Sequence, residues 1–166
     1  LNPYAIWKAV TQDSACSIVE DINPIMNIKE SEAVTYGGTG GRNSRAMVRT
    51  AREFHPSDMG VISESTTDSS DVAINTYTSA NPRFNSVRGT ANPIDMADIK
   101  PSNVLSTSAM LAVGAVNEDL RRTNFIGIQN NHSVACDGYK AQYVRTGYEH
   151  IVAKRAGAGF SNIAKE

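Results

Sequence analysis

The stretch Tyr36-Gly-Gly-Thr-Gly-Gly-Arg42 decides how the first half of the chain is interpreted, because four glycines in five positions predict a loop. Four arginines follow at spacings of three, four and three residues: Arg42, Arg45, Arg49 and Arg52. A helix would place all four guanidinium groups on one side, whereas a strand would scatter them. We therefore expect a helix over residues 42–52 that ends before His55-Pro56.

Outward from this stretch, the chain predicts a mixed α+β fold in two parts. Apolar residues at near-helical spacing, with Pro3 at the start, predict a helix from Asn2 to Val19 that Asp21 to Pro24 interrupts. Residues 63–70 resemble a solvated loop, 72–77 a strand, and 142–156 short strand-like runs. The prolines and asparagines of residues 81–103 predict a connector between a first part, residues 1–80, and a second, residues 104–166.

Composition limits the class of protein. Of the 166 residues, 40% are hydrophobic and 20% charged, which is typical of a globular protein, and no apolar run approaches the roughly 18–20 residues needed to cross a bilayer. The net charge of −1 lacks the basic excess of a free-standing nucleic-acid binder, so we expect any such contact to be local. Cys16 and Cys136 lack metal or redox spacing and are expected to be reduced thiols. Because the first residue is Leu1, we interpret the chain as a segment of something longer.

The glycine loop and the arginines that follow it are the first feature with possible chemistry. Glycines let a backbone approach a phosphate, and arginines bind it with forked donors. A solvated helix face explains the same arginines equally well. The loop is not a nucleotide-binding P-loop, since the Gly-Lys-Ser/Thr ending is missing. A second basic group, any member of which is more often simply solvated, comprises Arg121, Arg122, Lys140, Arg145, Lys154 and Arg155. The histidines and acidic pairs form no self-contained active site.

Several short motifs, taken in order, resemble the β subunit of multisubunit DNA-directed RNA polymerases. Asn23-Pro24, the glycines of 37–41 and Phe54 to Gly60 are similar to its fork region. The second part resembles the start of its hybrid-binding region through Ala109 to Val116, Glu118-Asp119, Arg121-Arg122, Ile126 to His132 and Val144 to Glu149. Thr67 to Ser70 departs from the family's Thr-Pro-Glu-Gly turn, and the variable region between the parts is short. Such divergence resembles the polymerases of giant bacteriophages.

This resemblance implies a chain that is not catalytic alone. Mg²⁺ would be held by aspartates of a partner β′-type subunit, and Arg122 or Arg121 would meet the triphosphate of the incoming nucleotide. Residues matching Gln129, Asn130 and His132 would lie near the RNA 3′ end. The fork residues expected to contact nucleic acid are Gly40, Gly41, Arg42, Arg45, Arg49 and Arg52.

The implied partners are the β′-type subunit, the remaining β-type segments, template DNA, nascent RNA and nucleoside triphosphates, with no membrane. The implied location is the cytoplasm of a bacterial host, with the virion as an alternative. Two other functions stay open: a non-catalytic nucleic-acid-binding or virion protein on the same scaffold, and a phosphohydrolase that uses the glycine loop.

Overall fold

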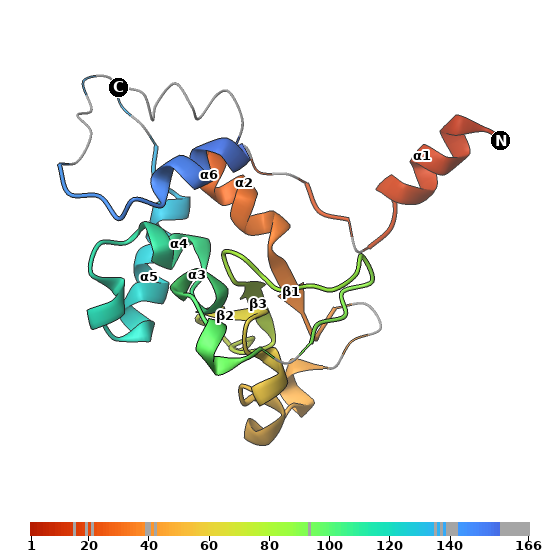
Figure 1. Cartoon of the computed structure of the whole chain (residues 1–166). Helices are drawn as coiled ribbons and strands as arrows, with labels where there is room; N and C mark the ends of the chain where they lie inside the picture. Colours follow the sequence, from red (N-terminus) through yellow and green to blue (C-terminus); the bar gives the residue numbers. More distant parts are fainter. Residues whose placement is uncertain are drawn as a thin grey trace.

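The fold is mixed α+β, as the sequence predicts (Figure 1). The computed structural model describes residues 1–14, 16–18, 20, 22–38, 41, 43–92, 94–134, 136, 138 and 143–156. The α-helices have the bounds α1 Pro3–Thr11, α2 Pro24–Ser31, α3 Pro101–Val104, α4 Thr107–Leu111, α5 Leu120–Asn131 and α6 Glu149–Ala156, and α3 and α5 contact a small sheet. No helix in these ranges combines the length and apolar character that a membrane span requires.

Three antiparallel strands form the sheet, in the order β1 (Ala33–Thr35), β3 (Asn75–Thr78), β2 (Ile62–Thr66). The predicted strand over 72–77 is confirmed only from Asn75. The residues before it form a turn in which Ala73 has φ 61° and the Ile74 amide donates to the Asp71 carbonyl at 3.0 Å. A backbone in that left-handed region cannot continue a strand.

The prediction of a solvated loop over residues 63–70 is wrong for its first half, which forms most of β2. Ser63 and Ser65 are 5% and 2% exposed. Their hydroxyls are satisfied inside the protein, because Ser63 Oγ donates to the Tyr77 carbonyl at 2.8 Å and Ser65 Oγ donates to Asn124 Oδ1 at 3.2 Å. Serine can be buried when each hydroxyl has such a partner.

Helix ends follow the capping residues. Asn2 caps α1, which begins at Pro3 as predicted but ends at Thr11. Helix α2 begins at Pro24, directly after the predicted interruption, and the sequence reasoning missed this helix. The strand-like prediction for residues 142–156 is wrong from Glu149 onward, where α6 begins. The Glu149 carboxylate accepts from the Thr146 and Gly147 amides at 2.9 and 2.8 Å, so the donors at this turn are satisfied.

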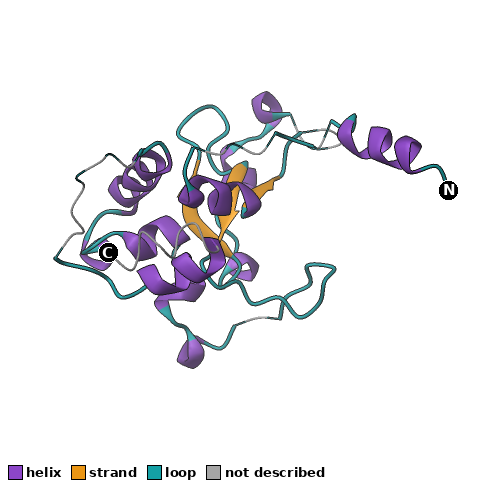
Figure 2. Ribbon diagram, turned by 90° about the horizontal axis from the view of Figure 1, so that it is seen from above, coloured by secondary structure: helices purple, strands orange, loops and turns teal. Residues whose placement is uncertain are grey.

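The two predicted parts are in contact, and the buried residues lie between them. Helix α4 packs against α5, α5 also packs against α2 and β2, and α6 packs against α2. The two ends of the connector are paired, because the Ala80 amide donates to the Leu105 carbonyl and the Asn81 amide donates to the Ser102 carbonyl, both at 2.9 Å. In contrast, α1 projects from the body in both views and none of its residues is buried (Figures 1 and 2).

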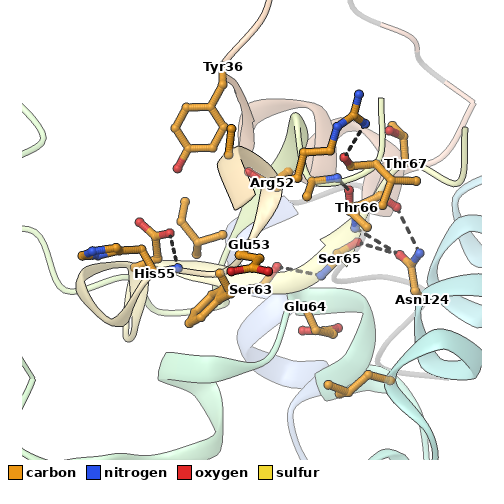
Figure 3. Close-up of a pocket in the computed structure, with 18 of the residues that line it drawn as sticks. Tyr36, Arg52, Glu53, His55, Ser63, Glu64, Ser65, Thr66, Thr67 and Asn124 are labelled. Carbon is orange, nitrogen blue, oxygen red and sulfur yellow. Dashed lines mark hydrogen bonds between the residues drawn. The ribbon is translucent and has the colours of Figure 1, made fainter. Parts of the chain in front are cut away.

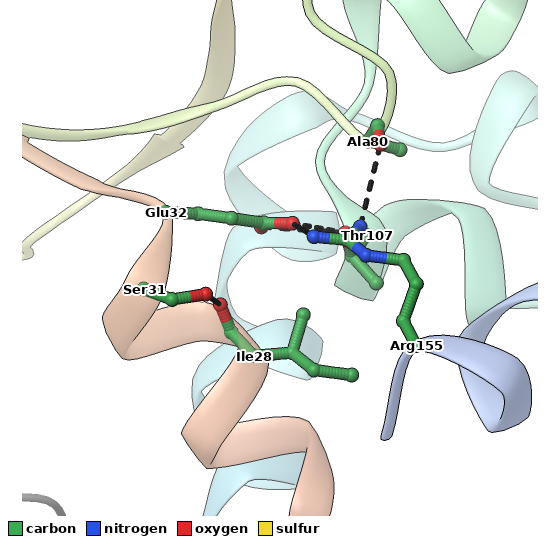
Figure 4. A network of polar contacts seen from close by, with 6 residues as sticks. All are labelled: Ile28, Ser31, Glu32, Ala80, Thr107 and Arg155. Atoms are coloured by element: carbon green, nitrogen blue, oxygen red, sulfur yellow. Dashed lines mark hydrogen bonds and ion pairs between the residues drawn. The ribbon is translucent and has the colours of Figure 1, made fainter. Parts of the chain in front are cut away.

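A buried carboxylate joins three of these elements (Figure 4). Glu32, 7% exposed, follows α2 and accepts from Arg155 Nη2 of α6 at 2.8 Å and from Thr107 Oγ1 of α4 at 2.9 Å. Arg155 Nη1 also donates to the Ala80 carbonyl at 3.4 Å. Burial raises the pKa of Glu32, and the hydrogen bonds from Arg155 and Thr107 partly oppose that rise.

A buried amine lies one turn earlier on α2. Lys29 is 5% exposed, and its Nζ lies 4.7 Å from the centroid of the Tyr77 ring, with no hydrogen-bond partner in the described part of the chain. A Cβ at Gly127 would lie 3.6 Å from that nitrogen, an ordinary contact, but only 2.9 Å from Ser108 Cβ, so α5 needs glycine there to pack against α4. Burial lowers the pKa of Lys29, while Glu64, Glu32 and Glu30 act against that shift.

Arg155→Ala removes the cation and leaves the Glu32 carboxylate buried. Removing one partner of a fully buried pair costs roughly 3–5 kcal/mol, but Arg155 is 37% exposed, so we expect a loss of about 2–3 kcal/mol in unfolding free energy at neutral pH. Because the raised pKa of Glu32 favours its neutral form in the folded state, the loss should shrink as the pH falls toward the ordinary value of 4.5. Urea titration followed by circular dichroism measures this. Lys154→Ala, the exposed neighbouring change, should have little effect, and a loss independent of pH would contradict the assignment.

Lys29→Met should leave stability unchanged or raise it by roughly 1 kcal/mol at neutral pH, since a buried amine without a hydrogen bond gives way to an apolar side chain of similar shape. In the natural chain the folded state loses its Lys29 proton at a lower pH than the unfolded state, so stability should rise with pH toward 10.5. The variant should lack that rise, which is checked by measuring the unfolding free energy of both proteins across this pH range. Lys8→Met on α1 is the exposed control. A large loss of stability in Lys29→Met would show instead that the ring and carboxylate contacts outweigh burial.

Candidate nucleic-acid interface

The glycine loop leaves β1 and turns sharply. Gly38 has φ 81°, the Gly41 amide donates to the Gly38 carbonyl at 3.0 Å, and the Gly37 amide donates to Thr35 Oγ1 at 3.0 Å. A Cβ at Gly41 would overlap the Gly37 carbonyl, so this position requires glycine. The predicted contact residues Gly40 and Arg42 lie outside the described residues.

The predicted helix over residues 42–52 is wrong in the part that can be described. Two 3₁₀ turns, Ser44–Ala46 and Arg49–Arg52, are separated by Met47 and by Val48, whose backbone is extended at φ −75° and ψ 166°. Arg52 is directed inward: its Nε donates to the Met47 carbonyl at 3.2 Å, and its Nη1 donates to the carbonyls of Ser70 and Val72 at 2.7 and 3.2 Å. The guanidinium thus fastens this segment to the β2–β3 turn, a long-range contact that helical spacing could not reveal.

The other two described arginines of the segment face solvent. Arg45 is exposed, and the side chain of Arg49 is 95% exposed. Arg49 Nε lies 4.0 Å from Glu53 Oε1, an exposed ion pair that contributes little to stability. Both cations are therefore accessible to a phosphate, whereas Arg52 is half-buried and its guanidinium already donates to three backbone carbonyls.

A pocket of about 900 Å³ lies between this segment, β2 and the start of α5 (Figure 3). Its lining includes Tyr36, Arg52, Phe54, Glu64, Arg121 and Asn124. Four acidic side chains against two arginines line it, so its interior does not suit a phosphate. Burial and the nearby Asp58 raise the pKa of Tyr36 above its ordinary value of 10.0.

The pocket wall is fixed by Asn124, which ties α5 to β2. Its Nδ2 donates to the Thr66 carbonyl at 3.0 Å, and its Oδ1 accepts from the Thr66 amide at 3.3 Å and from Ser65 Oγ (Figure 3). Asn124 is 8% exposed, and an amide that is satisfied on both sides holds a helix in one register.

The start of α5 carries two arginines shortly after the acidic pair Glu118 and Asp119. Asp119 caps the helix, accepting from the Arg121 amide at 3.3 Å, and Arg121 and Arg122 occupy a first turn that contains no acidic residue. Cations are unfavourable there because the helix dipole is positive at that end. The two arginines and the positive end of the dipole both attract an anion, and the carboxylates of Glu118 and Asp119 oppose that attraction. Both side chains are exposed, but only Arg121 is among the pocket residues.

The opposite end of α5 carries the residues expected near the RNA 3′ end. Gln129 and His132 are exposed and Asn130 is half-buried. One helix thus holds both predicted sets, about 10 Å apart from Arg122 to Gln129 at 1.5 Å per residue. Sequence reasoning missed this common helix and also missed the side chain of Asn23, which reaches the same end of α5. An Asn before a Pro, which indicates a helix cap, was the available signal for Asn23.

Comparison with known proteins gives one family match. Residues 1–45 match the model of the family described as Bacteriophage RNA polymerase. This segment contains α1, α2, β1, the glycine loop and Arg45. No curated protein matches the chain. Within the described residues, no group of three or more His, Cys, Asp or Glu is placed to hold a metal ion.

The exposed and the internal arginines should behave differently in DNA binding. Arg45→Ala and Arg49→Ala should each lower the salt dependence of DNA affinity by about one unit if the residue contacts a phosphate. Arg52→Ala should leave the salt dependence unchanged and lower the unfolding free energy by about 1–3 kcal/mol, since it loses hydrogen bonds to three carbonyls. Fluorescence anisotropy of a labelled forked duplex across a salt series measures the first effect. A changed slope for Arg52→Ala alone would reverse the assignment.

Proposed function

We propose that this chain forms part of a β-type subunit of a bacteriophage DNA-directed RNA polymerase and positions template DNA, the RNA 3′ end and the incoming nucleotide. The supporting observation is the contact between α2 and α5. Helix α2 lies inside the segment that matches the phage polymerase family, and α5 carries the two sets of residues assigned to nucleotide and RNA. The matched segment is thus in contact with the helix that carries the residues needed for the proposed chemistry.

In this proposal the chain contributes charge and position. Arginine at the start of α5 neutralises the triphosphate as phosphoryl transfer moves charge toward the leaving pyrophosphate, and the helix dipole adds to that field. Residues at the end of α5 hold the RNA 3′ end in line with the nucleotide. Arg45 and Arg49 bind the phosphates of the DNA near the point where its strands part.

The catalytic Mg²⁺ of a polymerase does not fit the described residues of this chain, which lack a cluster of metal ligands. We assign the metal to the partner β′-type subunit. The chain is then inert alone and works only in the assembled enzyme.

Alanine at the triphosphate arginine should weaken nucleotide use by about ten- to a hundred-fold, because a charge-assisted contact contributes roughly 1.5–3 kcal/mol. The spacing after Asp119 favours Arg122, and the neighbouring exposed Arg121 is the alternative, so the two alanine variants are compared in the same assembled polymerase. Single-nucleotide addition at varied nucleotide concentration gives kcat/KM for each. DNA affinity should be nearly unchanged in both.

Lys154→Ala, an exposed cation on α6, is the matched control for loss of one positive charge. Full nucleotide use by both arginine variants would contradict the assignment. Failure of the tagged natural chain to co-purify with a chain that carries the metal-binding aspartates, or RNA synthesis by the chain alone, would contradict the proposed function and favour the non-catalytic nucleic-acid-binding alternative.

A further inference from the structure

Asn23 lies where the start of α2 meets the end of α5. Its Oδ1 accepts from the Met26 amide at 2.8 Å, which caps α2. Its Nδ2 donates to the carbonyls of Asn130, Asn131 and Ser133 at 3.1, 2.8 and 2.8 Å. One amide therefore caps the beginning of one helix and the end of another, and its two hydrogens are shared among three acceptors.

The end of α5 depends on this outside donor. The last carbonyls of a helix have no partner within it, and a glycine beyond the end or a basic side chain in the last turn commonly supplies one. Helix α5 has neither: its C-cap is His132 at φ −98° and ψ 2°, and its last turn contains no basic residue. The backbone of Asn23 is extended, at φ −151° and ψ 160°, because the following Pro24 disfavours the helical region for the residue before it.

We propose that Asn23 is a positioning residue for the RNA 3′ end, acting through the last turn of α5. This inference rests on the proposed function, which assigns Gln129, Asn130 and His132 to that end of the RNA. Asn23 donates to the backbone of Asn130 itself and, through Asn131 and Ser133, brackets His132. Loss of these donors would let the last turn fray and move the contact residues, while the arginines at the far end of α5 keep their place.

Asn23→Asp separates the two roles of the side chain. The new carboxylate still accepts from the Met26 amide and suits the positive end of α2. It cannot donate, and at neutral pH it places negative charge against three carbonyl oxygens. Asn2→Asp is the matched control, because Asn2 caps α1 in the same way by accepting from the Tyr4 amide at 3.1 Å.

Hydrogen exchange on the purified chain tests the contact itself. The amides of His132 and Ser133 donate to the Gln129 and Asn130 carbonyls at 3.1 and 3.2 Å. In Asn23→Asp they should exchange on the order of ten-fold faster, and in Asn2→Asp at the natural rate. Unchanged exchange in Asn23→Asp would overturn the inference whatever the chain does in transcription.

The assembled polymerase tests the role. With Asn23→Asp, kcat for single-nucleotide addition should fall by about ten- to a hundred-fold, while KM for the nucleotide and the Kd for DNA stay unchanged. A general loss of folded enzyme would lower the active fraction but not kcat per active site. Faster exchange with unchanged kcat would overturn the inference and leave the proposed function standing. A photoreactive thiouridine at the RNA 3′ end should crosslink to residues 129–133 of the natural chain, and crosslinking elsewhere would overturn both.

Discussion

The buried carboxylate of Glu32 is the interaction on which the arrangement of this chain depends. It stands at the end of α2 and is satisfied by groups that are distant in sequence, the Arg155 guanidinium of α6 and the Thr107 hydroxyl of α4. A charge in this position tolerates no loose packing, because each missing partner would leave an unpaired ion in a poorly solvated site. This favours one arrangement of α2, α4 and α6, and α5 packs against both α2 and α4.

Much of the remaining interior is polar as well. Among the described residues, the buried apolar side chains are few and mostly small, with Ile74 and Val152 the largest that are fully buried, while serine, threonine and asparagine are common. Ser65, Asn124 and Ser106 are satisfied by specific partners, Ser106 by both oxygens of Glu64 at 2.8 and 2.9 Å. Such an interior gains specificity from directional hydrogen bonds and gains less from the removal of apolar surface from water.

The sequence predicted local features well and long-range ones poorly. Pro3 and the glycine loop were identified because backbone preference acts within a few residues. The burial of Ser63 and Ser65 could not be, since it depends on partners at Tyr77 and Asn124. The arginine spacing predicted a helix that does not form, because Arg52 binds carbonyls of the β2–β3 turn. The helix that holds both sets of residues proposed to meet nucleotide and RNA was missed because its buried face, which packs through Thr123 and Asn124, is polar and lacks an apolar stripe.

The projection of α1 has a spectroscopic consequence. Trp7 is the single tryptophan of the chain, it is 62% exposed on α1, and its ring stacks on Tyr4 with centroids 6.0 Å apart. Its fluorescence emission therefore reports on the surroundings of α1 and changes little when the buried core unfolds. A blue shift on mixing with another macromolecule would mean that this helix has been covered. The same signal during denaturation would follow only the fraying of nine residues, so the core must be followed by other optical probes.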